Sequence, residues 1–136
     1  MQTYRCTADR ADAALIAERV TGAHDWVSRL CGLLGRRALT DEEGLWLKPC
    51  KSIHTVGMRF AIDAVFLDDE NRVTKIGAGL PPWRVCFAPR ATQSVLELKA
   101  GRVKGVGLQV GDRLVFGACT EMFARATVRA SEKTSN

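Results

Sequence analysis

Residues 49–63, PCKSIHTVGMRFAID, hold a cysteine, a histidine and an aspartate that could act together in catalysis. In one hypothesis Cys50 is a nucleophile, His54 is its base and Asp63 orients the imidazole, as in a small hydrolase or transferase. In a second, Cys50 and His54 bind a metal, and Cys86 or Asp63 completes a tetrahedral site. No predicted helix N-terminus stands near Cys50 to favour its thiolate, and no second paired motif accompanies the metal set. We therefore expect no metal and no cofactor, and the three residues are catalytic candidates only if the protein is an enzyme.

The same stretch also fits a binding pocket, because its charged side chains lack partners nearby. Asp63 lies in an otherwise apolar predicted strand, where a carboxylate must be paired or reach water. Arg59 shares its strand face but lies four residues away, roughly 13 Å along the backbone, which is too far for a direct ion pair. Partners must come from elsewhere, so we expect a convergent polar pocket. The polar residues available for it are Ser52, His54, Thr55, Arg84 and Glu97.

A purely structural interpretation also fits four of these residues, and the sequence leaves both interpretations open. Asp63 would accept hydrogen bonds from loop amides, and Ser52 and Thr55 would close a turn. His54, between Ile53 and Val56, would be a hydrogen-bonded core residue.

The segment LPPWRVCF, residues 80–87, offers a second binding feature. Trp83 and Arg84 follow two prolines, which stiffen the loop. A flat indole beside a planar cation is a combination that holds sugars, carboxylates or peptide backbone. The alternative is that Trp83 caps the open end of a barrel and Arg84 is solvated.

The composition narrows the class of protein. A chain of 136 residues suffices for one domain with its own core. It has no run near the roughly 20 apolar residues of a membrane helix, and its N-terminus does not resemble a secretory signal, so we expect a cytoplasmic protein. The net charge of +5 is spread along the chain and aromatic residues make up only 7%, which argues against specific nucleic-acid binding. The five cysteines show no C-x-x-C spacing and are expected to be free, mostly buried thiols.

The elements that must position these residues are mainly strands. Trp26, Val27, Leu30, Leu33 and Leu34 recur at helical spacing after Asp25, so one short helix is predicted near residues 25–35. Residues 8–23 fit either a helix capped by Asp9 or a strand over Leu15–Val20.

Downstream, the pattern predicts a series of short strands. GLWLKP is an apolar run ended by Pro49, and Phe60–Leu67 with Val73–Ile76 forms a hairpin whose turn places Asn71 in a left-handed position. SVLELKAG is a strand stopped by Gly101, and a turn at Gly111 leads into a last strand. These features predict an α+β, mainly antiparallel single domain over 1–116, built as a small barrel or half-barrel. Residues 117–136 are expected to form a C-terminal extension with a disordered end.

Several of these segments together resemble the bacterial and archaeal family called domain of unknown function 192. The resemblance runs from Trp26 to Phe116, and the block EGLWLKPCKSIHTVGMRFAIDAVFLDDENRV is its most specific part. It implies a compact fold dominated by strands and favours the extended interpretation of Leu15–Val20, and it implies no activity. The positions to which it points are Ser52, His54, Thr55, Gly57, Met58, Arg59, Asp63, Trp83, Arg84 and Glu97.

The family includes a second, often exported branch in which an aromatic residue replaces the histidine, the arginine is missing and the aspartate stays. The resemblance therefore implies that Asp63 serves the fold and that His54 with Arg59 tunes a branch-specific site. This chain departs from the family at Ala61, where proline is usual, and at Asn71, where glycine is usual.

These observations favour a non-enzymatic binding or accessory module. Its partner would be a small polar or anionic ligand or a peptide. The pocket would be lined by Ser52, His54, Arg59, Asp63 and Arg84, with Trp83 as a wall. Two alternatives remain, namely a small hydrolase or transferase that uses Cys50 or Asp63 with His54, and a protein-interaction domain that acts through a sheet edge or the C-terminal tail.

Overall fold

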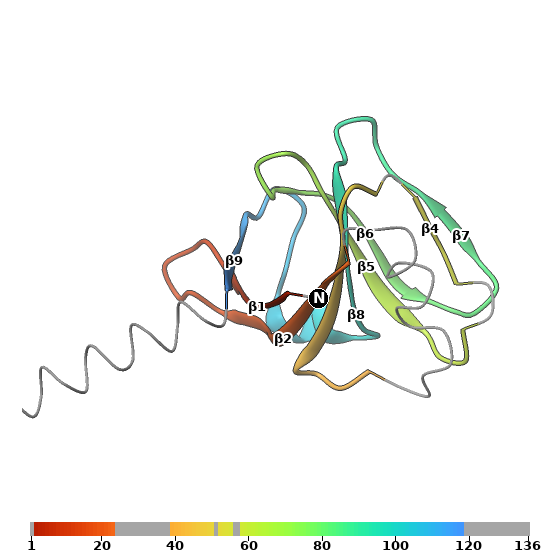
Figure 1. Cartoon of the computed structure of the whole chain (residues 1–136), viewed down its shortest axis with the longest axis horizontal. Coiled ribbons are helices and arrows are strands. Elements are labelled where there is room, and N and C mark those ends of the chain that lie inside the picture. Colours follow the sequence, from red (N-terminus) through yellow and green to blue (C-terminus); the bar gives the residue numbers. More distant parts are fainter. Residues whose placement is uncertain (1, 24–38, 51, 56–57, 119–136) are drawn as a thin grey trace, which may run out of the picture.

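The computed structural model describes residues 2–23, 39–50, 52–55 and 58–118. Within these ranges a seven-stranded sheet and a two-stranded sheet account for nearly all of the regular structure (Figure 1). The elements are β1 (Thr3–Ala8), β2 (Leu15–Ala23), β3 (Glu43–Leu47), β4 (Ser52–His54), β5 (Ile62–Leu67), β6 (Val73–Leu80), β7 (Val85–Phe87), β8 (Ser94–Lys99), α2 (Arg102–Val106) and β9 (Leu114–Ala118).

The large sheet has the order β6-β5-β8-β3-β2-β1-β9 and curls into a half-barrel. Its strand pairs are antiparallel except for β2 with β3, which is parallel. The two outer strands approach each other at one end. There the amide of Val73 donates to the carbonyl of Asp112 at 2.8 Å, and the amide of Leu114 donates to that of Asn71 at 2.9 Å. This architecture confirms the predicted mainly antiparallel, half-barrel domain.

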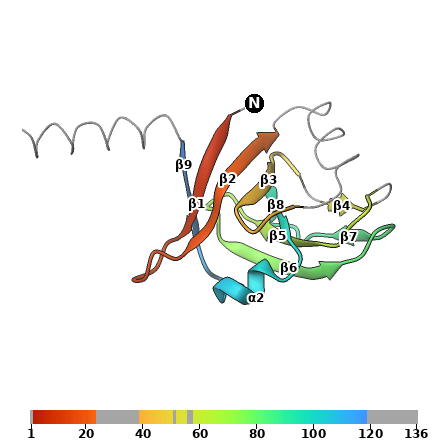
Figure 2. The same ribbon diagram turned by 90° about the horizontal axis from the view of Figure 1, so that it is seen from below.

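Each face of the large sheet has its own apolar core. One core includes Val65, Leu96, Leu98 and Leu114 with Val103 of α2, so we call this side the α2 face (Figure 2). The other includes Ala64, Phe66 and Val95 with Ile53 of β4 and Cys86 of β7, and we call it the β4–β7 face. Because both sides are covered, all six residues of β5 are buried. A strand covered on both faces must satisfy any polar side chain from within the protein.

The local turn signals predicted the strands well. The hairpin of β5 and β6 turns through Asn71, which has a φ of 61°, and β9 follows Gly111, which has a φ of 95°. Residues 15–23 are strand β2, so the helical alternative for them is wrong, and the extended interpretation is confirmed. Pairing with β1 and β3 over many residues outweighs the weak helical periodicity. The helix predicted near residues 25–35 lies outside the described residues.

Candidate functional site

Thr55 organises the corner of the molecule that carries the candidate binding residues. This side chain is fully buried, and its hydroxyl donates to the carbonyl of Pro81 at 2.6 Å and accepts from the amide of Arg84 at 2.8 Å. Its backbone amide donates to the carbonyl of Arg84 at 2.8 Å. Its carbonyl accepts from the amides of Met58 at 3.1 Å and Trp83 at 3.0 Å. Thr55 therefore closes a turn, which agrees with its structural interpretation. It also joins residues 58–59 to the loop at 81–84.

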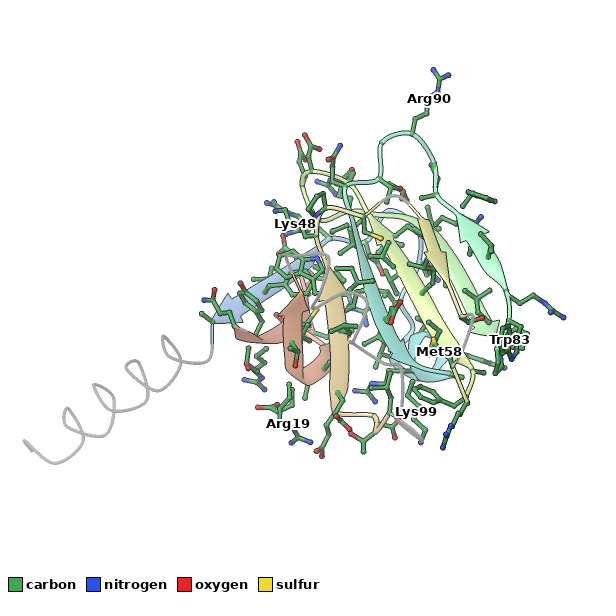
Figure 3. All side chains as sticks on the ribbon, turned by 45° about the vertical axis from the view of Figure 1, so that its right-hand side comes forward. Arg19, Lys48, Met58, Trp83, Arg90 and Lys99 are labelled. Carbon is green, nitrogen blue, oxygen red and sulfur yellow. The ribbon has the colours of Figure 1, made fainter. Side chains whose placement is uncertain are left out.

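Trp83 is the most unusual residue of this corner. Its φ of 65° lies in the left-handed region, where a bulky side chain is a genuine outlier. The side chain is nevertheless 66% exposed and projects from the surface near Met58 (Figure 3). Burial therefore does not force this conformation. The hydrogen bonds around Thr55 hold the loop instead, and they present the indole to solvent.

The arginines of the corner have no carboxylate partner among the described residues. Arg59 and Arg84 are exposed, and the guanidinium of Arg84 reaches only the carbonyl of the adjacent Trp83, at 3.4 Å. Both cations thus remain available to an anionic group. The backbone bonds of Thr55 join Met58, which precedes Arg59, to Trp83 and Arg84, a connection that the sequence alone did not reveal.

Asp63 does not face this corner. It is 1% exposed and accepts three backbone hydrogen bonds, from Gly79 at 2.8 Å and from Gly101 and Val103 at 3.0 Å each. The carboxylate caps the start of α2, whose N-cap residue Gly101 has no side chain to do so. Both oxygens are occupied in the interior, so Asp63 matches its structural interpretation as an acceptor for loop amides.

Glu97 is a second buried carboxyl, and its surroundings are the opposite. It lies on β8 between Leu45 and Ala64 of the neighbouring strands, which places it on the β4–β7 face. It is 5% exposed, and none of the described residues donates a hydrogen bond to it. Burial raises the pKa of the Glu97 carboxyl from 4.5 to about 7.

The remaining predicted residues are Ser52 and His54, of which the structure describes the backbone, and the cysteines. Ser52 pairs with Phe87 and His54 with Val85 in the small sheet, while the side chains of Ser52 and His54 lie outside the described part of the chain. Cys50 is half-buried, and its amide donates to the carbonyl of Gln93 at 2.9 Å. Cys6 and Cys86 are buried free thiols, and burial raises the pKa of Cys6. Cys31 and Cys119 lie outside the described residues.

Sequence reasoning missed two exposed apolar residues next to Trp83. Val85 is 56% exposed and Phe87 is 72% exposed, while Cys86 between them is buried. The signal was present, because V-C-F continues the alternation that a short strand shows, but proline-rich flanks obscured it. No helix among the described residues is long and apolar enough to cross a membrane.

Fold and site thus define a small, β-rich single domain with a half-barrel sheet and a solvent-facing aromatic corner. Residues 7–116 match the family DUF192, described as "Uncharacterized ACR, COG1430", and the chain belongs to this family. It is 30% identical over 95 residues to a UPF0127 protein of Pyrococcus furiosus, covering 68% of this chain and 81% of that protein.

Two solved structures share the fold. A protein of unknown function from Novosphingobium aromaticivorans superposes with a TM-score of 0.76 at 24% identity, over 85% of this chain and 86% of that one. A Sinorhizobium meliloti protein described as a candidate transcription regulator superposes with a TM-score of 0.75 at 23% identity, over 84% and 93% of the two chains. At these identities the similarity shows the fold alone.

Proposed function

We propose that this protein is a non-enzymatic binding module whose ligand is an anionic small molecule or a peptide. The ligand would rest on the indole of Trp83 and be held by the guanidinium groups of Arg59 and Arg84. Ser52 and His54, whose backbones pair with Phe87 and Val85, would border the same site.

The observation that carries this proposal is the exposed, left-handed Trp83. A residue with a side chain pays about 1–2 kcal/mol in this backbone region. Because the Trp83 side chain is mostly exposed, its burial offsets little of that cost. Strain that the surrounding structure maintains without a packing benefit is found mostly at functional sites. The neighbouring unpaired arginines indicate the chemistry, because guanidinium groups bind carboxylates and phosphates in a bidentate manner.

The enzymatic alternative has less support. It uses Cys50 or Asp63 with His54, and the Asp63 form loses support because both oxygens of Asp63 are held by backbone amides in the interior. A general base must lie within hydrogen-bond reach of the proton that it removes.

The test is a thermal-shift and calorimetric titration of the purified protein with phosphate, citrate, a sugar acid and short acidic peptides. The variants are Trp83→Gly and Arg84→Gln, and Arg90→Gln is the matched control because Arg90 is also exposed but lies far from Trp83 (Figure 3). We expect a bound anion to raise the melting temperature of the wild type and of Arg90→Gln. Its affinity should fall at least 10-fold in the other two variants.

Trp83→Gly also separates binding from folding. Glycine adopts a positive φ without strain, so its free energy of unfolding should stay within about 1 kcal/mol of the wild type. Equal binding by wild type and both site variants, or no binding of any probe to the wild type, would contradict the proposal.

A further inference from the structure

Strand β7 pairs with β4 on one side, and none of the other described strands pairs with its second edge. In an antiparallel pair, residues alternate between those bonded to the partner strand and those whose N–H and C=O groups point away. The amide of Thr55 donates to the carbonyl of Arg84, so Arg84 and Cys86 face β4, and Val85 and Phe87 face outwards. Among the described residues, the outward groups have one partner, the ammonium of Lys75, which donates to the carbonyl of Phe87 at 2.8 Å.

The side chains along this edge are apolar and exposed. Val85 and Phe87 lie two residues apart and therefore share one face of the strand, and both are more than half exposed. Natural sheet edges are normally protected by charges, prolines or covering loops, because open edges pair with other chains. An open edge with two exposed apolar side chains is therefore suited to receive another strand.

The segments of the chain that contain this edge and its neighbouring strands carry basic residues and no acids. Residues 48–59 and 73–93 carry six of the chain's 20 lysines and arginines and none of its 15 acids, which leaves 14 basic residues to 15 acids elsewhere. The basic residues are spread along the chain, as the sequence indicated, but the acids are absent from these two segments. The whole net positive charge therefore lies in the segments that contain β4, β6 and β7.

We infer that the edge of β7 binds an extended acidic peptide of a partner protein, which adds as a third strand to the small sheet. This inference rests on the proposed function and names its ligand. Apolar residues of the peptide would lie opposite Val85 and Phe87 with their amides bonded to β7. Acidic residues would alternate with them and meet Lys75 and the neighbouring Arg84.

Other occupants fit these observations less well. A second copy pairing through its own β7 would bring two acid-free, basic segments together, and like charges across strands are destabilising. A single nucleic-acid strand stacks successive bases on aromatic rings, whereas Trp83 and Phe87 are four residues apart, roughly 13 Å in an extended chain. Neither a nucleic acid nor a lipid surface uses the open backbone groups of a strand.

The test is fluorescence anisotropy with a labelled nine-residue peptide of alternating valine and glutamate. Two further peptides carry N-methyl groups, one on the valines, whose amides would face β7, and one on the glutamates, whose amides would face solvent. We expect the unmodified and glutamate-methylated peptides to bind alike and the valine-methylated peptide to bind at least 10-fold more weakly. A peptide of alternating valine and lysine should also bind at least 10-fold more weakly than the unmodified peptide.

The protein variants are Val85→Asp and its matched control Val115→Asp, an exposed valine on the edge strand β9. Val85→Asp should weaken binding at least 10-fold and Val115→Asp should leave it unchanged. The methylated peptides test the same contact on the unaltered protein, so the result does not depend on how well Val85→Asp folds.

The outcomes separate this inference from the proposed function. Binding of acidic peptides that needs Trp83 and Arg84 but tolerates either methylation pattern would overturn strand addition and leave the anion site standing. Tighter binding of labelled oligothymidylate or of phosphatidylserine vesicles than of the acidic peptide would overturn the peptide assignment. No binding of any peptide or anion would overturn both proposals.

Discussion

The two faces of the large sheet differ in how their charged residues are paired. On the α2 face, Asp63 is held by three backbone amides. Arg102 donates to the carbonyls of Leu15 and Ile16 at 3.1 and 3.0 Å.

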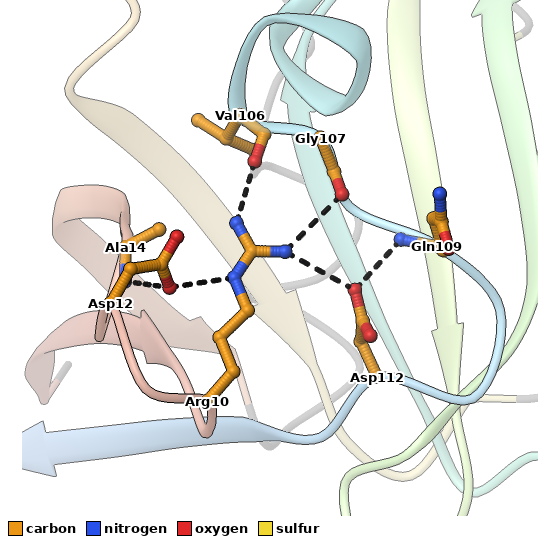
Figure 4. Close-up of polar contacts among 7 residues, drawn as sticks. All are labelled: Arg10, Asp12, Ala14, Val106, Gly107, Gln109 and Asp112. Carbon is orange, nitrogen blue, oxygen red and sulfur yellow. Dashed lines mark hydrogen bonds and ion pairs between the residues drawn. The ribbon is translucent and has the colours of Figure 1, made fainter.

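Arg10 shows the same pattern at the end of the hairpin between β1 and β2 (Figure 4). Its guanidinium donates to Asp12 at 2.8 Å and to the carbonyls of Val106 at 2.8 Å and Gly107 at 3.2 Å, and it lies 3.6 Å from Asp112. Arg10 therefore fastens the hairpin to the end of α2.

On the β4–β7 face several of the described charges lack such partners, although Lys75 donates to the carbonyl of Phe87. Glu97 is buried without a donor, and Arg59, Arg84 and Arg90 are exposed without a carboxylate. Residue type alone therefore does not separate a structural charge from a binding charge. A charge whose partners come from the fold stabilises it, whereas a charge left to solvent is available to a ligand.

The largest effect should come from removing the best-satisfied charge. Asp63→Ala leaves three amides without their acceptor, and we expect it to cost roughly 3–5 kcal/mol of unfolding free energy. Urea denaturation measures this, with Asp69→Ala in the exposed turn as control, expected within about 0.5 kcal/mol of the wild type. Equal stability of the two variants would show that the α2 face does not depend on this carboxylate.

The buried, unpaired Glu97 should make stability depend on pH. Its pKa is about 7 in the fold and 4.5 when exposed, so between these values the folded protein keeps a proton that the unfolded chain has lost. Its contribution to stability is therefore greatest below pH 4.5 and falls as pH rises through 7, by about 3 kcal/mol.

Glu97→Gln removes this dependence. Relative to the wild type, the variant should gain about 3 kcal/mol in urea denaturation at pH 8 and almost nothing at pH 4.5. Glu70→Gln, at an exposed position, controls for the change in net charge. The same difference at both pH values would mean that Glu97 is not held protonated by burial.

The smallest effect should come from removing single arginines, one bonded by the fold and one left to solvent. Arg10→Ala should lower stability by about 1–2 kcal/mol, because it removes charge-assisted hydrogen bonds to two carbonyls and Asp12. Arg84→Ala should change stability by less than about 0.5 kcal/mol. Thermal and urea denaturation of both variants measure the contrast, and equal losses would remove the distinction between the two faces.

Local sequence signals determined much of the fold. Runs of apolar residues marked β5 and β8, and Asn71 and Gly111 marked turns that require positive φ. Short or edge elements were harder to predict. The three residues of β7 and the five of α2 span too few positions for a period to emerge, and β1 depends on pairing with distant β9.

The candidate site was only partly readable in the sequence. Trp83 and Arg84 stood out by composition alone, since an aromatic and a cation after two prolines need no long-range information. Their connection to Arg59 became visible only through Thr55, which lies 29 residues before Arg84.

Tertiary structure alone decided which charges are satisfied. Asp63 and Glu97 are both acids in apolar strands, and nothing in the strands themselves separates them. Asp63 meets Gly101 and Val103, which are 38 and 40 residues away in the chain, whereas Glu97 faces Leu45 and Ala64. Hydrogen bonding needs a donor at a particular place in space, and only the folded chain brings distant donors there.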